Sequence, residues 1–243
     1  MGLKLMCVAA HPDDECFAFG GALALAAERG VETYVICLTD GQAATYRGQA
    51  VSAEALGQMR REEFAASCNV LGVAHDEVLD YQDGQLEFAN FSHAVHKLVE
   101  RMRRYQPHVV LTFGGDGALN THADHTVVSA FTTAAFHWSG RPKRFPDAGP
   151  IYQPERLYYQ TTSYFLPGRQ APLPMPWTLS LDIRSVMAKK LEAFRQHTTQ
   201  APLLEQVKPV FETHGSTEHY TLVAARDPHA AQQSTDMFEG ITF

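Results

Sequence analysis

Residues 4–15 read KLMCVAAHPDDE, and the fold prediction starts from this stretch. The apolar run at 3–9 is typical of a strand that is buried on both faces of a parallel sheet. The run ends abruptly in one imidazole and three carboxylates, on His11, Asp13, Asp14 and Glu15. In open parallel sheets, ligands bind outside the carboxyl ends of the strands. We therefore expect a functional site at residues 11–15.

Strand-like and helical patterns alternate through the first half of the chain. Apolar runs at 31–38 and 108–113 predict two further buried strands. Helical patterns lie between the strands, at residues 15–29, 53–71 and 91–105, and they stop at Gly30, Gly72 and before Pro107. This alternation indicates βαβ units with right-handed crossovers. We predict an α/β fold with a Rossmann-like, mostly parallel sheet flanked by helices.

The second half is richer in loops. Pro- and Gly-rich segments follow Trp138, with strand-like runs at IYQPERLYYQTTSYF (151–165) and TLSLDI (178–183). The pattern predicts a further helix at 184–199 and a short strand at 219–224. We see no internal repeat, and we predict one domain over residues 1–243 with a loop-rich C-terminal part.

Composition excludes several classes of partner. The formal net charge is −7 and the Lys and Arg residues are scattered. The sequence therefore predicts no basic patch that could bind nucleic acid or an anionic membrane. No stretch approaches the ~18 apolar residues that a membrane span requires. The four cysteines form no CxxC pair, so we predict buried thiols in a reducing cytoplasm.

A second cluster follows the strand at 108–113. The segment GGDGALNTHADH (114–125) again places histidines and a carboxylate between a strand and a helix, namely His122, Asp124 and His125. Strand ends in one sheet converge on one crevice, so His11, Asp14 and His125 would supply two nitrogens and one oxygen to a metal. Such a set leaves positions for water and substrate, as in catalytic zinc sites. Asp13 would then be free to act as a base, and His122 to act on the substrate.

Other interpretations of these residues remain open at this point. Acidic residues in a first helical turn stabilise the helix dipole by ~0.3–1 kcal/mol each, but this does not explain a histidine at the end of a buried strand. Two histidines and a carboxylate also describe the triad of non-haem iron(II) oxygenases, so Fe²⁺ or another divalent metal is an alternative to Zn²⁺. A metal-stabilised binding protein without turnover is a third possibility.

The two motifs carry a family resemblance. AHPDDE (10–15) and HADH (122–125) resemble the AHPDDE and HPDH patterns of the PIG-L/LmbE family of zinc-dependent N-acetylglucosamine deacetylases. Further stretches look similar to this family, namely LTDG, QMRREEF, LDYQDGQL and KKLEAFRQHTTQ. The resemblance covers most of the chain. One departure is Ala123, where the family usually has proline.

The resemblance implies a role for each site residue. It implies that His11, Asp14 and His125 bind zinc and that Asp13 is the general base. Protonated His122 would stabilise the oxyanion or protonate the leaving amine. It also implies three further roles: Asp124 would orient His122 or His125, Arg60 would contact substrate, and Asp83 would bind sugar hydroxyls.

The implied reaction is removal of an N-acetyl or related N-acyl group from a small molecule that contains glucosamine. Zinc would activate water and polarise the amide carbonyl. The loops at 41–52 and 139–178 are expected to shape the pocket. Their sequences do not indicate which aglycone the substrate carries. The sequence leaves open whether the protein is a homo-oligomer, and what roles His197 and Asp40 have.

Overall fold

The computed structural model describes residues 2–166, 171, 173–227, 230 and 233–241. They form a seven-stranded sheet with the order β3-β2-β1-β4-β5-β7-β6. The strands are β1 (Lys4–Ala9), β2 (Glu32–Thr39), β3 (His75–Tyr81), β4 (Val109–Phe113), β5 (Arg156–Thr161), β6 (Leu179–Asp182) and β7 (Thr217–Ala225). The pairs from β3 to β5 are parallel, whereas β7 is antiparallel to both of its neighbours. This arrangement confirms the predicted α/β class with a mostly parallel sheet.

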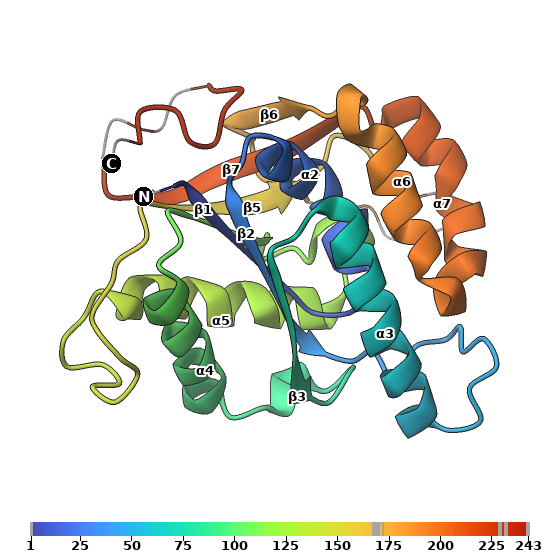
Figure 1. Ribbon diagram of the computed structural model, residues 1–243, viewed down its shortest axis with the longest axis horizontal. Helices are drawn as coiled ribbons and strands as arrows, with labels where there is room; N and C mark the ends of the chain where they lie inside the picture. Colours follow the sequence, from blue (N-terminus) through green and yellow to red (C-terminus); the bar gives the residue numbers. More distant parts are fainter. Residues whose placement is uncertain (1, 167–170, 172, 228–229, 231–232, 242–243) are drawn as a thin grey trace.

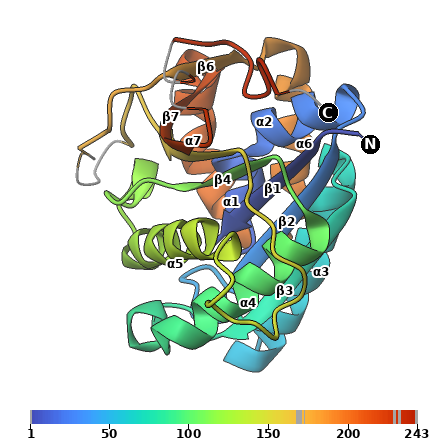
Figure 2. The same ribbon diagram turned by 90° about the vertical axis from the view of Figure 1, so that its left-hand side faces the viewer.

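Helices cover both faces of the sheet (Figures 1 and 2). One face carries α2 (Gly20–Glu28), α3 (Ala53–Leu71), α6 (Met187–Gln196) and α7 (Ala201–His214). The other carries α4 (Phe91–Tyr105) and α5 (Ala123–Ser139), which pack against each other. Short helical turns complete the fold: α1 (Asp14–Phe17), η1 (Leu86–Phe88), η2 (Ala118–Asn120), η3 (Arg184–Val186) and η4 (Thr198–Gln200). None of the described helices is both long enough and apolar enough to cross a bilayer.

The ends of α3 show why the local sequence predicts this helix correctly. Ser52 precedes the helix, and its hydroxyl accepts a hydrogen bond from the Ala55 N–H at 3.0 Å. A side-chain acceptor at this position satisfies a backbone donor that the first turn leaves free. Gly72 ends the helix with a φ of 78°, a left-handed conformation that glycine adopts without strain. The predicted bounds of this helix and of α4 are confirmed.

The predicted helix at 15–29 is wrong as a single element, because the chain forms α1 and α2 with a break between them. The break directs the start of α2 onto Glu218, whose carboxylate accepts hydrogen bonds from the Gly21 and Ala22 N–H groups. A β-carbon at Gly21 would lie only 2.4 Å from the Ile183 side chain. Tertiary packing therefore sets the break, and helical periodicity does not reveal it.

Four other elements differ from the sequence prediction. The strand predicted at 151–165 is confined to β5. The helix predicted at 184–199 is confined to α6, with the short turns η3 and η4 on either side. The strand β3 was not predicted because it is a sheet edge with a largely polar sequence, HDEVLDY. The helix α7 was not predicted either, because it contains Pro202 in its first turn and Pro209 in its interior.

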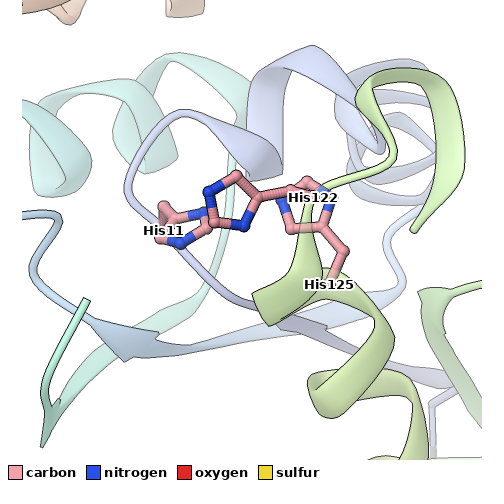
Figure 3. A group of neighbouring side chains, drawn as sticks. All are labelled: His11, His122 and His125. Atoms are coloured by element: carbon pink, nitrogen blue, oxygen red, sulfur yellow. The ribbon is translucent and has the colours of Figure 1, made fainter. Parts of the chain in front are cut away.

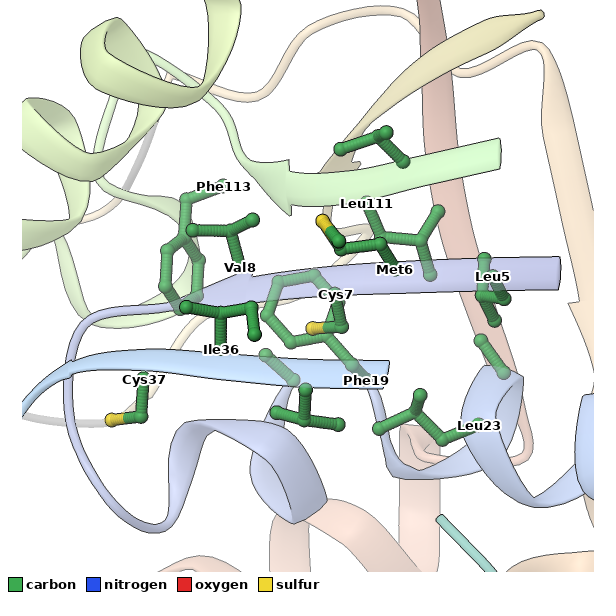
Figure 4. Close-up of a cluster of buried hydrophobic side chains, with 14 of the residues drawn as sticks. Leu5, Met6, Cys7, Val8, Phe19, Leu23, Ile36, Cys37, Leu111 and Phe113 are labelled. Atoms are coloured by element: carbon green, nitrogen blue, oxygen red, sulfur yellow. The ribbon is translucent and has the colours of Figure 1, made fainter. Parts of the chain in front are cut away.

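The apolar core lies between the parallel strands and the helices. Figure 4 shows side chains of β1, β2 and β4 gathered with Phe19 and Leu23, and all the labelled residues are almost completely buried. In the sheet β1 pairs directly with β4, so that Cys7 lies opposite Leu111. This pairing brings the two sequence motifs to the same edge of the sheet.

Candidate metal centre and active site

Three histidines from the two motifs converge beyond the ends of β1 and β4 (Figure 3). The ring of His11 lies 4.7 Å from that of His122 and 5.4 Å from that of His125, measured between centroids. One nitrogen from each ring lies within 4.8 Å of the others, a spacing at which side chains can share a metal ion. The convergence that the sequence predicts is therefore present.

Each of the two buried histidines has one ring nitrogen held by the protein. His125 Nδ1 lies 3.1 Å from the Gly117 carbonyl oxygen, and His11 Nε2 lies between two carboxylates. The opposite nitrogens both face Asp14, with His125 Nε2 at 3.1 Å from Oδ1 and His11 Nδ1 at 3.6 Å from Oδ2. Metal-binding histidines are usually held in this way through the nitrogen that does not bind the ion. The contact of the buried His125 Nε2 with Asp14 lacks hydrogen-bond geometry, so a nitrogen, nitrogen, oxygen donor set fits a metal here.

Two carboxylates hold His11 from the side opposite Asp14. Asp83 Oδ1 and Asp124 Oδ2 each lie 3.1 Å from His11 Nε2. The Asp124 carboxylate also accepts hydrogen bonds from two backbone N–H groups in the turn after β3, and Asp83 Oδ2 accepts one from Ala43. Both acids are buried and firmly positioned. They fix the orientation of the His11 ring.

These contacts differ from the roles that the sequence predicted. Asp124 was predicted to orient His122 or His125, but its carboxylate contacts His11. The reason is that Asp124 lies in the first turn of α5, with its side chain directed toward the turn after β3. Asp83 contacts His11 and the Ala43 N–H and also lines the cavity described below, so its predicted binding of sugar hydroxyls stays a prediction.

The electrostatics around His11 favour a cation. Burial alone would lower the pKa of His11, but its hydrogen bonds to the carboxylates of Asp124, Asp14 and Asp83 hold that pKa well above its usual value. Burial would raise the pKa of Asp14, but His125 and His11 hold it well below its usual value. Three carboxylates thus surround one imidazole. A divalent ion between His11 and His125 would balance this excess of negative charge.

Asp13 lies in a different environment from its neighbour Asp14. Its Oδ2 accepts a hydrogen bond from Arg60 at 2.9 Å, and the same guanidinium also donates to the carbonyl oxygens of Pro12 and Gly41. Burial raises the pKa of Asp13 to about 6, although the positive charge of Arg60 acts in the opposite direction. A carboxyl with this pKa is poised to exchange a proton near neutral pH. Arg60 also lines the cavity described below, so its predicted contact with substrate stays a prediction beside its bond to Asp13.

Glu15, which the sequence predicts to be an acid at a helix start with some influence on the site, holds the backbone of Asp13 in place. Asp13 has a φ of 116°, which is strained for a residue with a side chain. Its N–H donates to Glu15 Oε2 at 2.9 Å. The other oxygen, Oε1, contacts His197 Nε2 at 2.7 Å and accepts a hydrogen bond from Ser67 at 2.5 Å. Its position in the motif, directly after Asp14, is the only sequence signal for this role.

His122 presents a hydrogen-bond donor to the site. Its Nδ1 accepts a hydrogen bond from the Asp124 N–H at 3.1 Å, so the neutral ring carries its proton on Nε2. Burial lowers the pKa of His122, and the neighbouring His11 and His125 act in the same direction. The neutral ring is therefore favoured before substrate binds. The protonated His122 that the sequence predicts concerns the reacting complex, and it stays a prediction.

A cavity of about 270 Å³ opens over these residues. Asp13, Asp14, His11 and His122 line its floor, and the loop residues Ala43 to Tyr46 line one side. The rest of the lining comes from Phe17, Arg60, Asp83, Gly84, Asn120, Leu166, Gln200 and Leu203. Both loops expected to shape the pocket contribute to it, although residues 167–170 and 172 of the 139–178 loop lie outside the described residues. Tyr46 is held by Gln200 and Gln206.

Other candidate residues lie outside this cavity. His93 contacts Tyr81, and His96 contacts Asp147, so neither of these helix residues is near the histidine cluster. Asp40 pairs with Arg61 at 3.1 Å. His197, whose role the sequence left open, reaches the site only through Glu15.

The comparisons with known proteins agree with this geometry. The chain is 27% identical to a 1D-myo-inositol 2-acetamido-2-deoxy-alpha-D-glucopyranoside deacetylase from Rhodococcus jostii, over 98% of both chains. It is 27% identical to a diacetylchitobiose deacetylase from Thermococcus kodakarensis, over 82% of this chain and 70% of the relative. The N,N'-diacetylchitobiose deacetylase of Pyrococcus horikoshii shares the fold, with a TM-score of 0.76 and 22% identity over 90% of this chain and 83% of that one.

The profile of one protein family matches residues 6–136, which is more than half of the 243 residues. Its description is PIG-L, GlcNAc-PI de-N-acetylase. The matched segment contains both motifs and every residue predicted for the site. The family resemblance and the prediction of a hydrolase acting on amide bonds are confirmed. The chain belongs to the PIG-L family of GlcNAc-PI de-N-acetylases.

Proposed function

We propose that this protein is a zinc-dependent N-deacetylase that releases acetate from a small molecule containing N-acetylglucosamine. The observation that carries the proposal is the arrangement of His11 and His125 around Asp14. Each ring has one nitrogen fixed by the protein and the other directed at the same carboxylate. The names of the relatives support the amide of an acetamido sugar as the reacting group.

His11, Asp14 and His125 would hold the metal. When bound, a divalent zinc ion would polarise the amide carbonyl and lower the pKa of water, as zinc does in hydrolases. Zinc is favoured over magnesium because imidazole nitrogen is a preferred zinc ligand, whereas magnesium prefers an all-oxygen site. The carboxylates of Asp83 and Asp124, which accept from His11 Nε2, would keep His11 in the required orientation.

Asp13 would act as the general base. One oxygen is fixed by Arg60, which leaves Oδ1 to accept a proton from the attacking water. The water oxygen then bonds to the amide carbon. The raised pKa of Asp13, about 6, suits this step, since a stronger base takes a proton more readily and is still largely deprotonated at neutral pH. The buried pair of Glu15 and His197 would keep Asp13 in place.

His122 would stabilise the developing negative charge. Its Nε2–H can donate a hydrogen bond to the carbonyl oxygen as that oxygen gains charge. The carbon–nitrogen bond breaks when the proton taken by Asp13 is delivered to the amide nitrogen. Acetate and a glucosamine-type amine are the products. The larger cavity, with Tyr46 and Gln200 in its wall, would receive the sugar and its aglycone.

The test combines metal analysis with product detection. We expect purified protein loaded with zinc to release acetate from at least one N-acetylglucosaminyl compound, in a set that varies only in the aglycone. Release should stop on chelation and resume with zinc. Oxygen consumption by an iron(II)-loaded protein would instead support an oxygenase. A bound metal with no turnover of any compound would support a binding protein.

A further inference from the structure

The helix α3 carries a stripe of buried polar side chains. Arg60, Glu63 and Ser67 follow one another at intervals of three and four residues, which places them on one face of the helix. Arg60 bonds to Asp13 and Ser67 bonds to Glu15, so both contact the candidate active site. Glu63 lies between them and bonds to a different part of the chain.

Glu63 is a buried carboxylate that is held by the short turn η4. The residue is only 8% exposed. Its Oε1 accepts hydrogen bonds from the Thr198 hydroxyl at 2.6 Å and the Thr199 N–H at 2.8 Å, and its Oε2 accepts one from the Thr199 hydroxyl at 2.7 Å. The arginines at 60–61 pair with carboxylates elsewhere. Because a buried charge is costly unless donors surround it, these three bonds tie η4 firmly to α3.

The turn η4 in its turn holds one wall of the large cavity. Gln200, its last residue, donates through Nε2 to the Tyr46 carbonyl oxygen at 3.0 Å and to the Thr199 hydroxyl oxygen at 3.1 Å. The Tyr46 hydroxyl accepts a hydrogen bond from Gln206 of α7 at 2.6 Å. Tyr46 and Gln200 both line the cavity, whereas Glu63 and Thr199 do not. A chain of contacts therefore runs from Glu63 to the cavity wall.

The loop at 41–48 has anchors of two kinds. At its start, backbone groups bond to Arg60 and Asp83, which also contact the first sequence motif. Farther along, Tyr46 is held by η4 and α7, and Figure 1 shows the loop reaching past the end of α3 toward α7. Loss of the contact between Glu63 and η4 would release the second kind of anchor and leave the first.

We propose that Glu63 is a positioning residue that sets the affinity for substrate by holding η4, and through it Tyr46, against the large cavity. This proposal rests on the proposed function and names a residue that fixes the shape of its substrate site. Because Glu63 does not line the cavity, its loss should weaken substrate binding and leave the chemical step intact. A purely structural role would instead reduce the amount of active protein, which lowers kcat and leaves KM unchanged.

Two variants cut the link from opposite sides. Glu63→Gln removes the charge and keeps the size, while Thr199→Val removes the hydroxyl and keeps the shape. The substrate is the N-acetylglucosaminyl compound that zinc-loaded wild type turns over fastest. We expect each variant to raise its KM by about 10-fold, as for the loss of one hydrogen bond to a charged group. The kcat and the zinc content should stay close to those of wild type.

Glu62→Gln is the matched control, because Glu62 is the adjacent residue on α3, is exposed and bonds to Gln58 of the same helix. It should leave KM and kcat unchanged. Gln200→Met tests the order of the links, since it removes the amide that holds the loop. If Glu63 acts through Gln200, then Glu63→Gln should raise KM little further in the Gln200→Met protein. Fully additive effects of the two replacements would contradict this order.

Limited proteolysis monitors the loop without any substrate. Trypsin cleaves after Arg47, which is exposed and directly follows Tyr46, and cleavage requires local opening of the chain. We expect this cleavage to be about 10-fold faster in Glu63→Gln and Thr199→Val than in wild type, because loss of an anchor raises the open population. Cleavage after Lys143, which is exposed in the loop after α5, is the internal reference and should keep its rate.

The proposal and the proposed function can fail separately. An unchanged KM and unchanged cleavage after Arg47 in both variants would overturn the role of Glu63 and leave the deacetylase intact. A fall in kcat with an unchanged KM would show a purely structural role and would overturn it as well. If no N-acetylglucosaminyl compound releases acetate, the proposed function itself is wrong, and the cleavage rates still decide whether Glu63 holds the loop.

Discussion

Asp14 faces the histidine cluster, whereas Asp13, its neighbour in sequence, faces Arg60 on the other side of the same turn. On the Asp14 side, His125 and His11 outweigh burial and hold the carboxyl pKa well below its usual value. On the Asp13 side, burial outweighs Arg60 and raises the carboxyl pKa to about 6. Two residues of one type, one peptide bond apart, thus lie in opposite electrostatic environments.

The two carboxylates of the AHPDDE motif can therefore serve two different chemical roles. A metal ligand must be deprotonated, and a strongly lowered pKa keeps Asp14 in that state. A general base must exchange a proton near neutral pH, and the raised pKa of Asp13 permits this. The strained backbone at Asp13, held by Glu15, is what turns the two carboxylates in different directions.

The largest effect is expected from removal of the base. Asp13→Ala should lower kcat by about 10²- to 10⁴-fold, the usual contribution of a positioned acid–base group. Zinc affinity should change little, because Asp13 is not a predicted ligand. Steady-state kinetics on the zinc-loaded variant, with zinc content measured on the same sample, checks both statements. Loss of zinc with full activity after reloading would contradict the assignment.

The buried pair of Glu15 and His197, which holds Asp13 in place, should matter mainly for the stability of the fold. His197→Ala leaves the buried Glu15 without its ion-pair partner, and breaking a buried pair in this way typically costs about 3–5 kcal/mol. Denaturant unfolding of the metal-free proteins measures the loss. A double-mutant cycle with Glu15→Gln supplies the control, since His197→Ala should cost much less when Glu15 carries no charge. Equal costs in both backgrounds would show that the pair is not coupled.

On the metal side, Asp124→Asn should weaken zinc binding by about 10- to 100-fold, as expected when a residue that orients a metal-binding histidine is changed. The amide would weaken the contact with His11 without removing the side chain. Competition with a zinc-binding dye measures the affinity. The same replacement at Asp147, which pairs with His96 of α4 and does not line the cavity, is the control. An unchanged affinity in Asp124→Asn would show that His11 does not depend on this carboxylate.

The smallest change concerns the pH profile. The positive charge of Arg60 lowers the pKa of Asp13, so its removal in Arg60→Met should raise that pKa further. A base works only when deprotonated, and activity is therefore lost as pH falls through its pKa. The acidic limb of the kcat profile should move to higher pH. Arg61→Met is the matched control, since Arg61 pairs with Asp40 instead, and its profile should keep the position of that limb.

The parallel half of the fold could be predicted from the sequence, and the antiparallel half much less so. Buried strands such as β1 and helices such as α3 carry their own signals, an apolar run in one case and Ser52 with Gly72 in the other. The edge strand β3 has no apolar pattern because one side of it has no neighbouring strand. The break before α2 depends on Glu218, almost 200 residues away, and no local pattern encodes it.

In the candidate site, too, some features could be predicted from the sequence and others could not. His11, Asp14 and His125 could be predicted because their residue types are unusual at strand ends. The partners of Arg60 and Asp83 could not, since each lies on an element whose distance from the motif depends on the folded sheet. Glu15 reads as an ordinary acid at a helix start, and only its contacts with His197 and Ser67 show that it supports Asp13.

The difference between the two carboxylates is tested most directly by the zinc content of Asp13→Asn and Asp14→Asn, measured by mass spectrometry after identical loading and dialysis. Both replacements remove one charge from the same turn and keep the side-chain size. If Asp14 binds the metal and Asp13 does not, Asp13→Asn should retain about one zinc per chain, like wild type and like other three-ligand catalytic sites. Asp14→Asn should lose its zinc. Equal zinc content in the two variants, or loss from Asp13→Asn alone, would contradict the division of roles.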